Sequence, residues 1–188
     1  MKKYKIIYAD PPWSYNDKMG NDVAFQAMTY PTMNLEEIKK LKINSISDND
    51  CVLFMWAVSP LLKEAFEVIE HWGFRYKTVA FVWNKQTVNG IDISNMGRWT
   101  MGNVEVCLLG TKGKPQRIRK YIKQLITATR REHSRKPDEA RERIVQLMGN
   151  LSRIELFARD DGSKNLFGEN PLDGWDVWGN EVENDITL

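Results

Sequence analysis

The chain has 188 residues, a formal net charge of +2 and 42% hydrophobic residues. This length and composition exclude a disordered chain and argue against two independent domains, so we expect one domain over residues 1–188. Cys51 and Cys107 lie in apolar runs, with no Cys-x-x-Cys spacing and no nearby histidine pair. We therefore expect buried free thiols and no metal site.

Targeting signals and common nucleotide-binding motifs are not found in the sequence. No signal peptide, membrane span or lipidation motif is recognisable, so we expect a cytoplasmic protein without a membrane partner. Neither a GxxxxGK[ST] phosphate loop nor a GxGxxG dinucleotide fingerprint occurs. The sequence therefore does not support a nucleoside-triphosphate phosphate loop or a standard dinucleotide-binding site, which are two common functions of chains with alternating strands and helices.

The first predicted element is a short buried strand over residues 4–9, followed by Asp10, Pro11, Pro12 and Trp13. The two prolines end the strand because neither can donate to a sheet ladder. An acid, two proline carbonyls and an aromatic ring then lie near the carboxyl end of a strand, where open α/β sheets bind ligands. A planar base with an exocyclic amino group could donate hydrogen bonds to the acid and the carbonyls and stack on the aromatic ring. An ordinary proline-rich turn remains the alternative.

This motif matches the chemistry of amino-group methylation. The amino nitrogen of adenine is a poor nucleophile because its lone pair is delocalised into the ring. Hydrogen bonds from its N–H groups to the Asp10 carboxylate and the Pro11 carbonyl would favour a tetrahedral nitrogen, so that alignment and a preorganised pocket supply most of the rate. Trp13 or Tyr15 could stack on the base.

The rest of the chain alternates helical and strand patterns. Asn34 and Glu37 predict a capping box that opens a helix to Leu41, and Ser59-Pro60 predicts the start of a second helix. Further strands are expected over 51–57, 74–83, 104–110, 153–158 and 175–178, with a third helix over 137–148. This alternation predicts a mostly parallel, doubly wound α/β sheet.

Three further expectations concern the surface. The polar stretch 84–101 predicts an active-site loop, and residues 182–188 a flexible tail. Trp56, Trp72 and Trp83 lie in apolar patterns and should be core, whereas Trp99 has polar neighbours. Residues 112–136, the basic segment, hold ten Lys or Arg and one acid, a pattern typical of phosphate binding, although a solvated helix face is the alternative. The nucleic-acid contacts expected from these features are Tyr15, Trp99, Lys112, Lys114, Arg117, Arg119, Arg130, Arg131 and Arg135.

Four segments together carry a resemblance to a known family. They are Asp10–Trp13, Glu105–Gly113, the Ser-x-Lys-Pro-Asp-Glu sequence within 133–139, and Ile154–Arg159 with the later turn Gly179-Asn180-Glu181. In this order they resemble the S-adenosylmethionine-dependent N6-adenine methyltransferases that include the eukaryotic mRNA adenosine methyltransferase catalytic subunit and its bacterial and phage relatives. The likeness covers nearly the whole chain.

The resemblance implies a Rossmann-like methyltransferase fold with a permuted order, in which the catalytic motif precedes the cofactor strand. It implies that Asp10, Pro11, Pro12 and Trp13 are catalytic and that Lys136 pairs with Glu105 near the cofactor. The residues it implies as contacts of S-adenosyl-L-methionine are Asp10, Glu105, Lys136, Glu155, Arg159, Asn180 and Glu181.

The expected activity is methylation of adenine N6 in DNA, because compact versions resemble bacterial or phage enzymes that modify genomes. RNA N6-adenosine methylation and a non-catalytic nucleic-acid-binding partner subunit are the alternatives. Methylation of cytosine or of a protein amide is disfavoured, because those related enzymes carry Ser or Asn before the prolines and Tyr after them. The short chain leaves little room for a recognition domain, so we expect a short recognition sequence or low selectivity; a homodimer remains open.

Overall fold

A computed structural model describes residues 2–14, 32–97, 99–131, 135–158, 172–179, 182, 186 and 188. Within them, seven strands form one sheet in the order β5-β3-β4-β2-β1-β6-β7. Strand β4 runs antiparallel to its neighbours β2 and β3, and the remaining pairings are parallel. The bounds are β1 Tyr4–Ala9, β2 Ser47–Ala57, β3 Arg75–Gln86, β4 Val104–Lys112, β5 Leu125–Thr129, β6 Arg153–Leu156 and β7 Asp176–Trp178.

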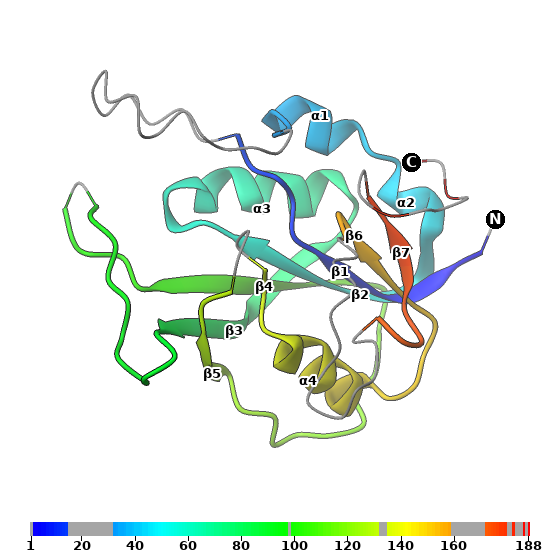
Figure 1. Ribbon diagram of the computed structural model, residues 1–188. Helices are drawn as coiled ribbons and strands as arrows, with labels where there is room; N and C mark the ends of the chain where they lie inside the picture. The colour runs from blue at the N-terminus through cyan, green and yellow to red at the C-terminus, as the bar shows by residue number, and fades with distance from the viewer. Residues whose placement is uncertain are drawn as a thin grey trace.

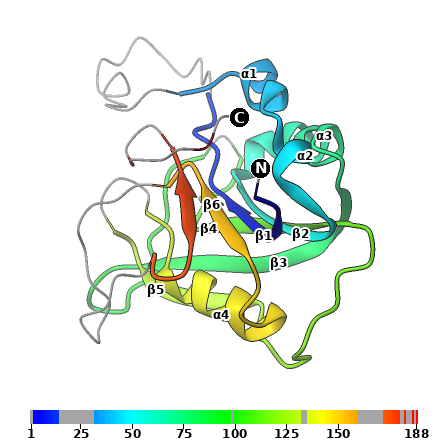
Figure 2. The same ribbon diagram turned by 90° about the vertical axis from the view of Figure 1, so that its right-hand side faces the viewer.

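Helices cover both faces of the sheet, as Figures 1 and 2 show. On one face lie α1 (Leu35–Lys40), α2 (Ile43–Ile46) and α3 (Leu62–His71), which follows a 3₁₀ turn at Ser59–Leu61; α4 (Asp138–Met148) covers the other face. Side chains alternate along β1, so that Ile7 packs towards the first group and Ile6 towards α4. Central strands buried on both faces explain the continuous apolar runs in the sequence.

The mostly parallel α/β sheet expected from the sequence is confirmed, with one antiparallel strand, β4, between β3 and β2. Strand β4 reverses because residues 87–103 join it to β3 without a crossover helix. The capping box of α1 is present in both directions, with distances of 2.7 and 3.0 Å between Asn34 and Glu37. Ser59, by contrast, forms no side-chain cap, since the 3₁₀ turn takes its place.

The expected core positions are also confirmed. Trp56, Trp72 and Trp83 are buried, and so are both cysteine thiols. Most of the expected flexible tail lies outside the described residues, but Ile186 and Leu188 pack half-buried against the core layer that faces α1 to α3. The carboxyl ends of β1, β2 and β3, together with the start of β4, thus meet at one edge of a rigid sheet.

Candidate active site

The segment after β1 forms a fixed elbow at this edge. The Trp13 amide donates to the Pro11 carbonyl (2.8 Å), and the Met33 amide donates to the Pro12 carbonyl (2.9 Å). The Trp13 indole N–H donates to the Trp56 carbonyl (3.1 Å) and its ring packs half-buried against the core. Both proline carbonyls therefore already accept one main-chain hydrogen bond. A carbonyl oxygen has two lone pairs, so that of Pro11 keeps the capacity to accept a second hydrogen bond.

Four charged side chains form a continuous row beside this elbow, which we call the charge row: Asp10, Lys136, Glu105 and Lys85. The Lys136 ammonium lies 2.7 Å from Asp10 Oδ2 and 3.2 Å from Glu105 Oε2. Lys85 pairs with the other Glu105 oxygen, Oε1. The expected pairing of Lys136 with Glu105 is thus present. Two acids and two bases balance, which is what a partly dehydrated site requires.

The charge row joins segments that are distant in the sequence. Asp10 follows β1, Lys85 lies near the end of β3, Glu105 lies near the start of β4, and Lys136 precedes α4. Lys136 is 8% exposed and lies over the Trp56 ring, 5.7 Å from its centroid. The Asp10 side chain is 34% exposed, so it is the member that can meet a molecule from solution.

Lys85 is a member of this row that sequence reasoning missed. It follows the buried Trp83 by two positions on β3, and Trp83 pairs in register with Glu105 on β4. Side chains two positions apart on a strand share a face, so Lys85 reaches Glu105 diagonally. Only the register of two strands reveals this contact, although an acid inside an apolar strand was a sign that some cation must lie opposite.

The electrostatics keep Lys136 and Glu105 in their charged forms. Burial alone would lower the pKa of Lys136, but the carboxylates of Asp10 and Glu105 outweigh it and raise that pKa. Burial alone would raise the pKa of Glu105, but Lys136 and Lys85 outweigh it and lower that pKa. At neutral pH Lys136 is therefore an ammonium ion and does not serve as a general base.

These shifts predict how stability depends on pH. A lowered carboxyl pKa stabilises the fold above the ordinary value of 4.5, and that contribution is lost as the pH falls through the lowered value. The raised pKa of Lys136 stabilises the fold at all lower pH and is lost only as the pH rises through a value above 10.5. We therefore expect the free energy of unfolding of Glu105→Gln, measured by urea titration, to fall less steeply below pH 4.5 than that of the wild type. An equally steep fall of the free energy of unfolding below pH 4.5 in the two proteins would contradict a charged Glu105.

The surroundings of Glu155 differ from those expected of a residue that contacts the cofactor. It is buried in β6, and both of its oxygens accept hydrogen bonds from the Arg141 guanidinium, at 2.6 and 2.7 Å. Arg141 also donates to Asp138 (2.8 Å) and lies over the Tyr8 ring, 5.7 Å from its centroid. Arg141 was not anticipated from the sequence. The Glu155 carboxylate thus belongs to an internal ion pair between α4 and β6, and its expected contact with the cofactor stays a prediction.

The same Asp138 orders the approach to the charge row. Its carboxylate accepts from Arg131 (2.5 Å) and Arg135 (3.1 Å) as well as from Arg141. The Arg130 amide donates to the Gln86 carbonyl, one residue beyond Lys85 (2.8 Å). Three of the expected phosphate contacts, Arg130, Arg131 and Arg135, therefore lie beside the carboxyl edge of the sheet.

The other half of the basic segment lies elsewhere. Glu105 and Lys112 stand near opposite ends of β4, about 23 Å apart at a strand rise of about 3.3 Å per residue. Lys112 donates to Asn44 (2.5 Å) and Ser47 (2.8 Å), and the Lys114 amide donates to Asp50 (2.6 Å). Strand β4 thus carries Lys112 and Lys114 to the far edge of the sheet, away from Asp10, and their expected nucleic-acid contacts stay predictions.

Arg117 and Arg119 also lie away from the charge row, and their expected nucleic-acid contacts stay predictions. The amides of Ile118 and Arg119 donate to the Leu147 carbonyl, in the last turn of α4, at 2.8 and 3.3 Å. Lys136 precedes the first turn of that helix, about 15 Å away at a rise of about 1.5 Å per residue. The sequence also gave no sign of β5, which separates the two halves of the basic segment.

Three further observations complete the site. Trp99 is 97% exposed in the connection between β3 and β4. Tyr15, Arg159, Asn180 and Glu181 lie outside the described residues, so their expected roles stay predictions. Among the described residues, no group of three or more His, Cys, Asp or Glu is placed to hold a metal ion, and no helix is long and apolar enough to cross a bilayer.

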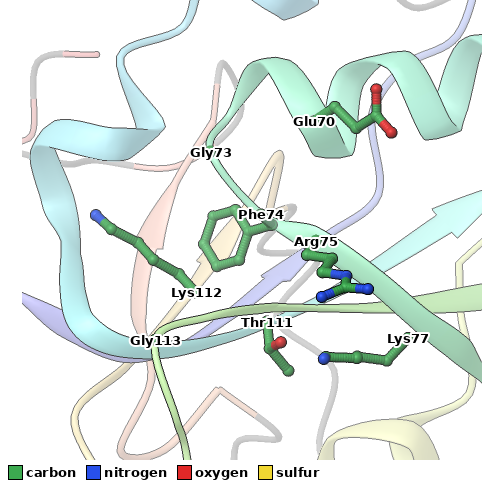
Figure 3. Close-up of a pocket in the computed structure, with 8 residues that line it drawn as sticks. All are labelled: Glu70, Gly73, Phe74, Arg75, Lys77, Thr111, Lys112 and Gly113. Atoms are coloured by element: carbon green, nitrogen blue, oxygen red, sulfur yellow. The ribbon is translucent and has the colours of Figure 1, made fainter.

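A hollow of about 510 Å³ lies at the far edge and is shown in Figure 3. It is open to solvent and lined by Phe74, Arg75 and Lys112 around Gly113, with Glu70 contributed by α3. Because Lys112 lies at the opposite end of β4 from Glu105, this hollow is separate from the charge row. We place the candidate active site at the charge row, where buried, paired charges meet an exposed carboxylate.

Comparison with known proteins identifies the family of the chain. The MT-A70 family profile matches residues 4–181. The Type II methyltransferase M.MunI of Mycoplasma sp. is 37% identical, over 96% of this chain and 78% of that protein. An N(6)-adenosine-methyltransferase MT-A70-like protein of Arabidopsis thaliana is 31% identical over 83% of this chain, and the human METTL3 catalytic subunit is 28% identical over 96%. The chain spans 22% and 28% of the length of those two proteins. The profile covers almost the whole chain, which therefore belongs to the MT-A70 family of methyltransferases.

Proposed function

We propose that this chain transfers a methyl group from S-adenosyl-L-methionine to the N6 amino group of adenine in DNA. The observation that carries the proposal is the partly exposed Asp10 carboxylate, held by the buried Lys136 at the carboxyl edge of a methyltransferase sheet. Open α/β sheets bind ligands at this edge. A carboxylate fixed there can accept an N–H hydrogen bond from an exocyclic amino group.

The donor set fits the proposed cofactor. Its amino-acid end carries an ammonium and a carboxylate, which match the carboxylates of Asp10 and Glu105 and the ammonium of Lys136. These three residues would hold it, and Arg159, Asn180 and Glu181 are proposed as further contacts. When bound, S-adenosyl-L-methionine supplies an electrophilic methyl carbon.

The residues of this chain would act on the adenine by orientation. Asp10 accepts one N–H bond and the second lone pair of the Pro11 carbonyl accepts the other, which favours a tetrahedral amino nitrogen. Lys136 stays protonated and fixes the Asp10 carboxylate, so the rate arises from preorganised dipoles rather than from a strong base. The proton of the methylated amino group leaves late, to water.

DNA is favoured because the Type II methyltransferase is matched over 78% of its length, whereas the adenosine methyltransferases are matched over less than a third. RNA is the second candidate, since those relatives are named as adenosine methyltransferases. Arg130, Arg131 and Arg135 are proposed to contact phosphates, which both nucleic acids share. The target base must leave a duplex stack, or arrive in a single strand, to reach Asp10.

The test is transfer of labelled methyl groups to matched deoxy- and ribo-oligonucleotides, followed by mass analysis of the digested nucleosides. We expect N6-methyldeoxyadenosine, and no product when every adenine is replaced by purine, which lacks the amino group. Product on the ribo-oligonucleotide alone would mean that the substrate is RNA and not DNA. Methylcytosine would overturn the choice of base, and binding of oligonucleotide and methyl donor without transfer would indicate a non-catalytic subunit.

A further inference from the structure

The connection between β3 and β4, which we call the arm (residues 87–103), is rooted at the charge row. The Ile93 amide donates to the Lys85 carbonyl (2.8 Å), and the Lys85 amide donates to the Asn103 carbonyl (3.1 Å). Asp92 accepts from the Asn84 and Gln86 side chains, both at 2.9 Å. The arm therefore begins and ends beside the Lys85–Glu105 pair, and Figure 1 shows it projecting beyond the sheet on the side where β4 begins.

The tip of the arm is a tight turn. Asn95 and Gly102 exchange two main-chain hydrogen bonds, of 2.8 and 2.9 Å. A Cβ atom on Gly97 would lie 2.3 Å from the Thr100 carbonyl oxygen, so the turn requires glycine there. The described residues between the bridged pair are thus held in a compact loop rather than in an extended strand.

The tip exposes apolar side chains that contribute little to the fold. Trp99 is 97% exposed and Met96 is 87% exposed, with Met101 exposed beside them. Such side chains on a slender loop do not form a broad apolar face of the kind that stable protein interfaces bury. Near the root, the exposed Arg130 and Arg131 supply positive charge. The arm thus carries apolar and aromatic side chains at its tip and has cations near its root. This arrangement suits a nucleic acid, in which the bases offer π-faces on the inside and the phosphates lie on the outside.

We propose that the arm enters a nucleic-acid duplex beside the target adenine and that Trp99, with Met96, fills the gap left in the base stack. The inference rests on the proposed function, because it assigns the arm to delivery of adenine to Asp10. Apolar wedges inserted between base pairs unstack them and so lower the cost of extruding a base. An adenine already in a single strand needs no such help.

The experiment compares Trp99→Ala with Tyr121→Ala in single-turnover methylation of one adenine, presented in a duplex or in a single strand of the same sequence. Tyr121 is a matched control, since it is 95% exposed but lies away from the arm. It stands between Arg119, whose amide donates to the Leu147 carbonyl in the last turn of α4, and Gln124, whose side chain donates to the Val79 carbonyl. We expect Trp99→Ala to lower the duplex rate about tenfold and the single-strand rate by less than about twofold. Tyr121→Ala should change neither.

A fluorescence measurement tests base extrusion apart from chemistry. With 2-aminopurine at the target position of the duplex, the wild type should raise the emission and Trp99→Ala should not. An equal loss of rate on both substrates, or wild-type activity on single strands alone, would overturn the inference. So would sedimentation showing a wild-type dimer that Trp99→Ala dissociates, since the tip would then contact a second copy. Wild-type protein that brightens 2-aminopurine but transfers no methyl group would overturn the proposed function and leave the inference supported.

Discussion

Replacement of Asp10 by alanine is expected to lower the methylation rate of the bound complex by about 10²–10³-fold, the usual effect of removing a preorganised hydrogen-bonding group. The reason is that this carboxylate is the exposed member of the charge row. Lys136 keeps Glu105 as a partner at 3.2 Å, so the site should stay folded. We expect the affinity for S-adenosyl-L-methionine, measured by calorimetry, to fall only a few-fold, because Glu105 and Lys136, the other two residues proposed to hold it, remain.

Asp176→Ala provides a matched control for this variant. Asp176 is also an aspartate paired with a lysine, Lys2 at 2.6 Å, and its side chain is 37% exposed, but it lies on β7. Its removal should leave methylation unchanged. Full activity of Asp10→Ala would remove that carboxylate from the mechanism. A loss of cofactor affinity as large as the loss of rate would assign Asp10 to cofactor binding instead.

Local sequence patterns were enough to predict most of the helices and strands. The run Tyr4–Ala9 is apolar and ends at two prolines, and the α4 sequence opens with Asp138 and ends at Gly149, whose φ is +87°. These signals act within a few residues of one another, so they can be read without knowing the fold. The motif at Asp10 was visible for the same reason.

Contacts that depend on strand register could not be predicted in this way. Lys85 reaches Glu105 only because β3 and β4 pair antiparallel, a direction that the alternating pattern did not give. The basic segment looked continuous along the chain, but β5 and the length of α4 distribute it over opposite edges of the sheet. Charge density along a sequence therefore does not establish that the charges share a surface.

The internal pair of Arg141 and Glu155 should give the largest change in stability. Arg141→Met leaves the Glu155 carboxylate buried in β6 with neither oxygen paired to the guanidinium that now holds both. Breaking a buried ion pair by removing one partner costs about 3–5 kcal/mol. We expect a loss of that size in the free energy of unfolding measured by urea titration.

Arg143→Met is the matched control on the same helix. Arg143 pairs with Glu139 at 2.6 Å and also donates to the Lys123 and Leu125 carbonyls, but Glu139 is 43% exposed and both carbonyl contacts are exposed, so water can solvate the acceptors that remain. The expected cost is about 1 kcal/mol. Equal losses for Arg141→Met and Arg143→Met would contradict the view that burial of Glu155 determines the effect.

A double variant separates the cost of an unpaired charge from the value of the pair itself. Arg141→Met with Glu155→Leu removes both charges, and Asp138 retains Arg131 and Arg135 as partners. Replacing both members of a buried pair by apolar residues of similar volume is often neutral, so the double variant should recover at least half of the stability lost in Arg141→Met. If it does, the pair is not required for a stable α4–β6 contact. If the double variant instead stays as unstable as Arg141→Met, the charged pair is needed for the α4–β6 contact that fixes Lys136, just ahead of that helix, beside Asp10.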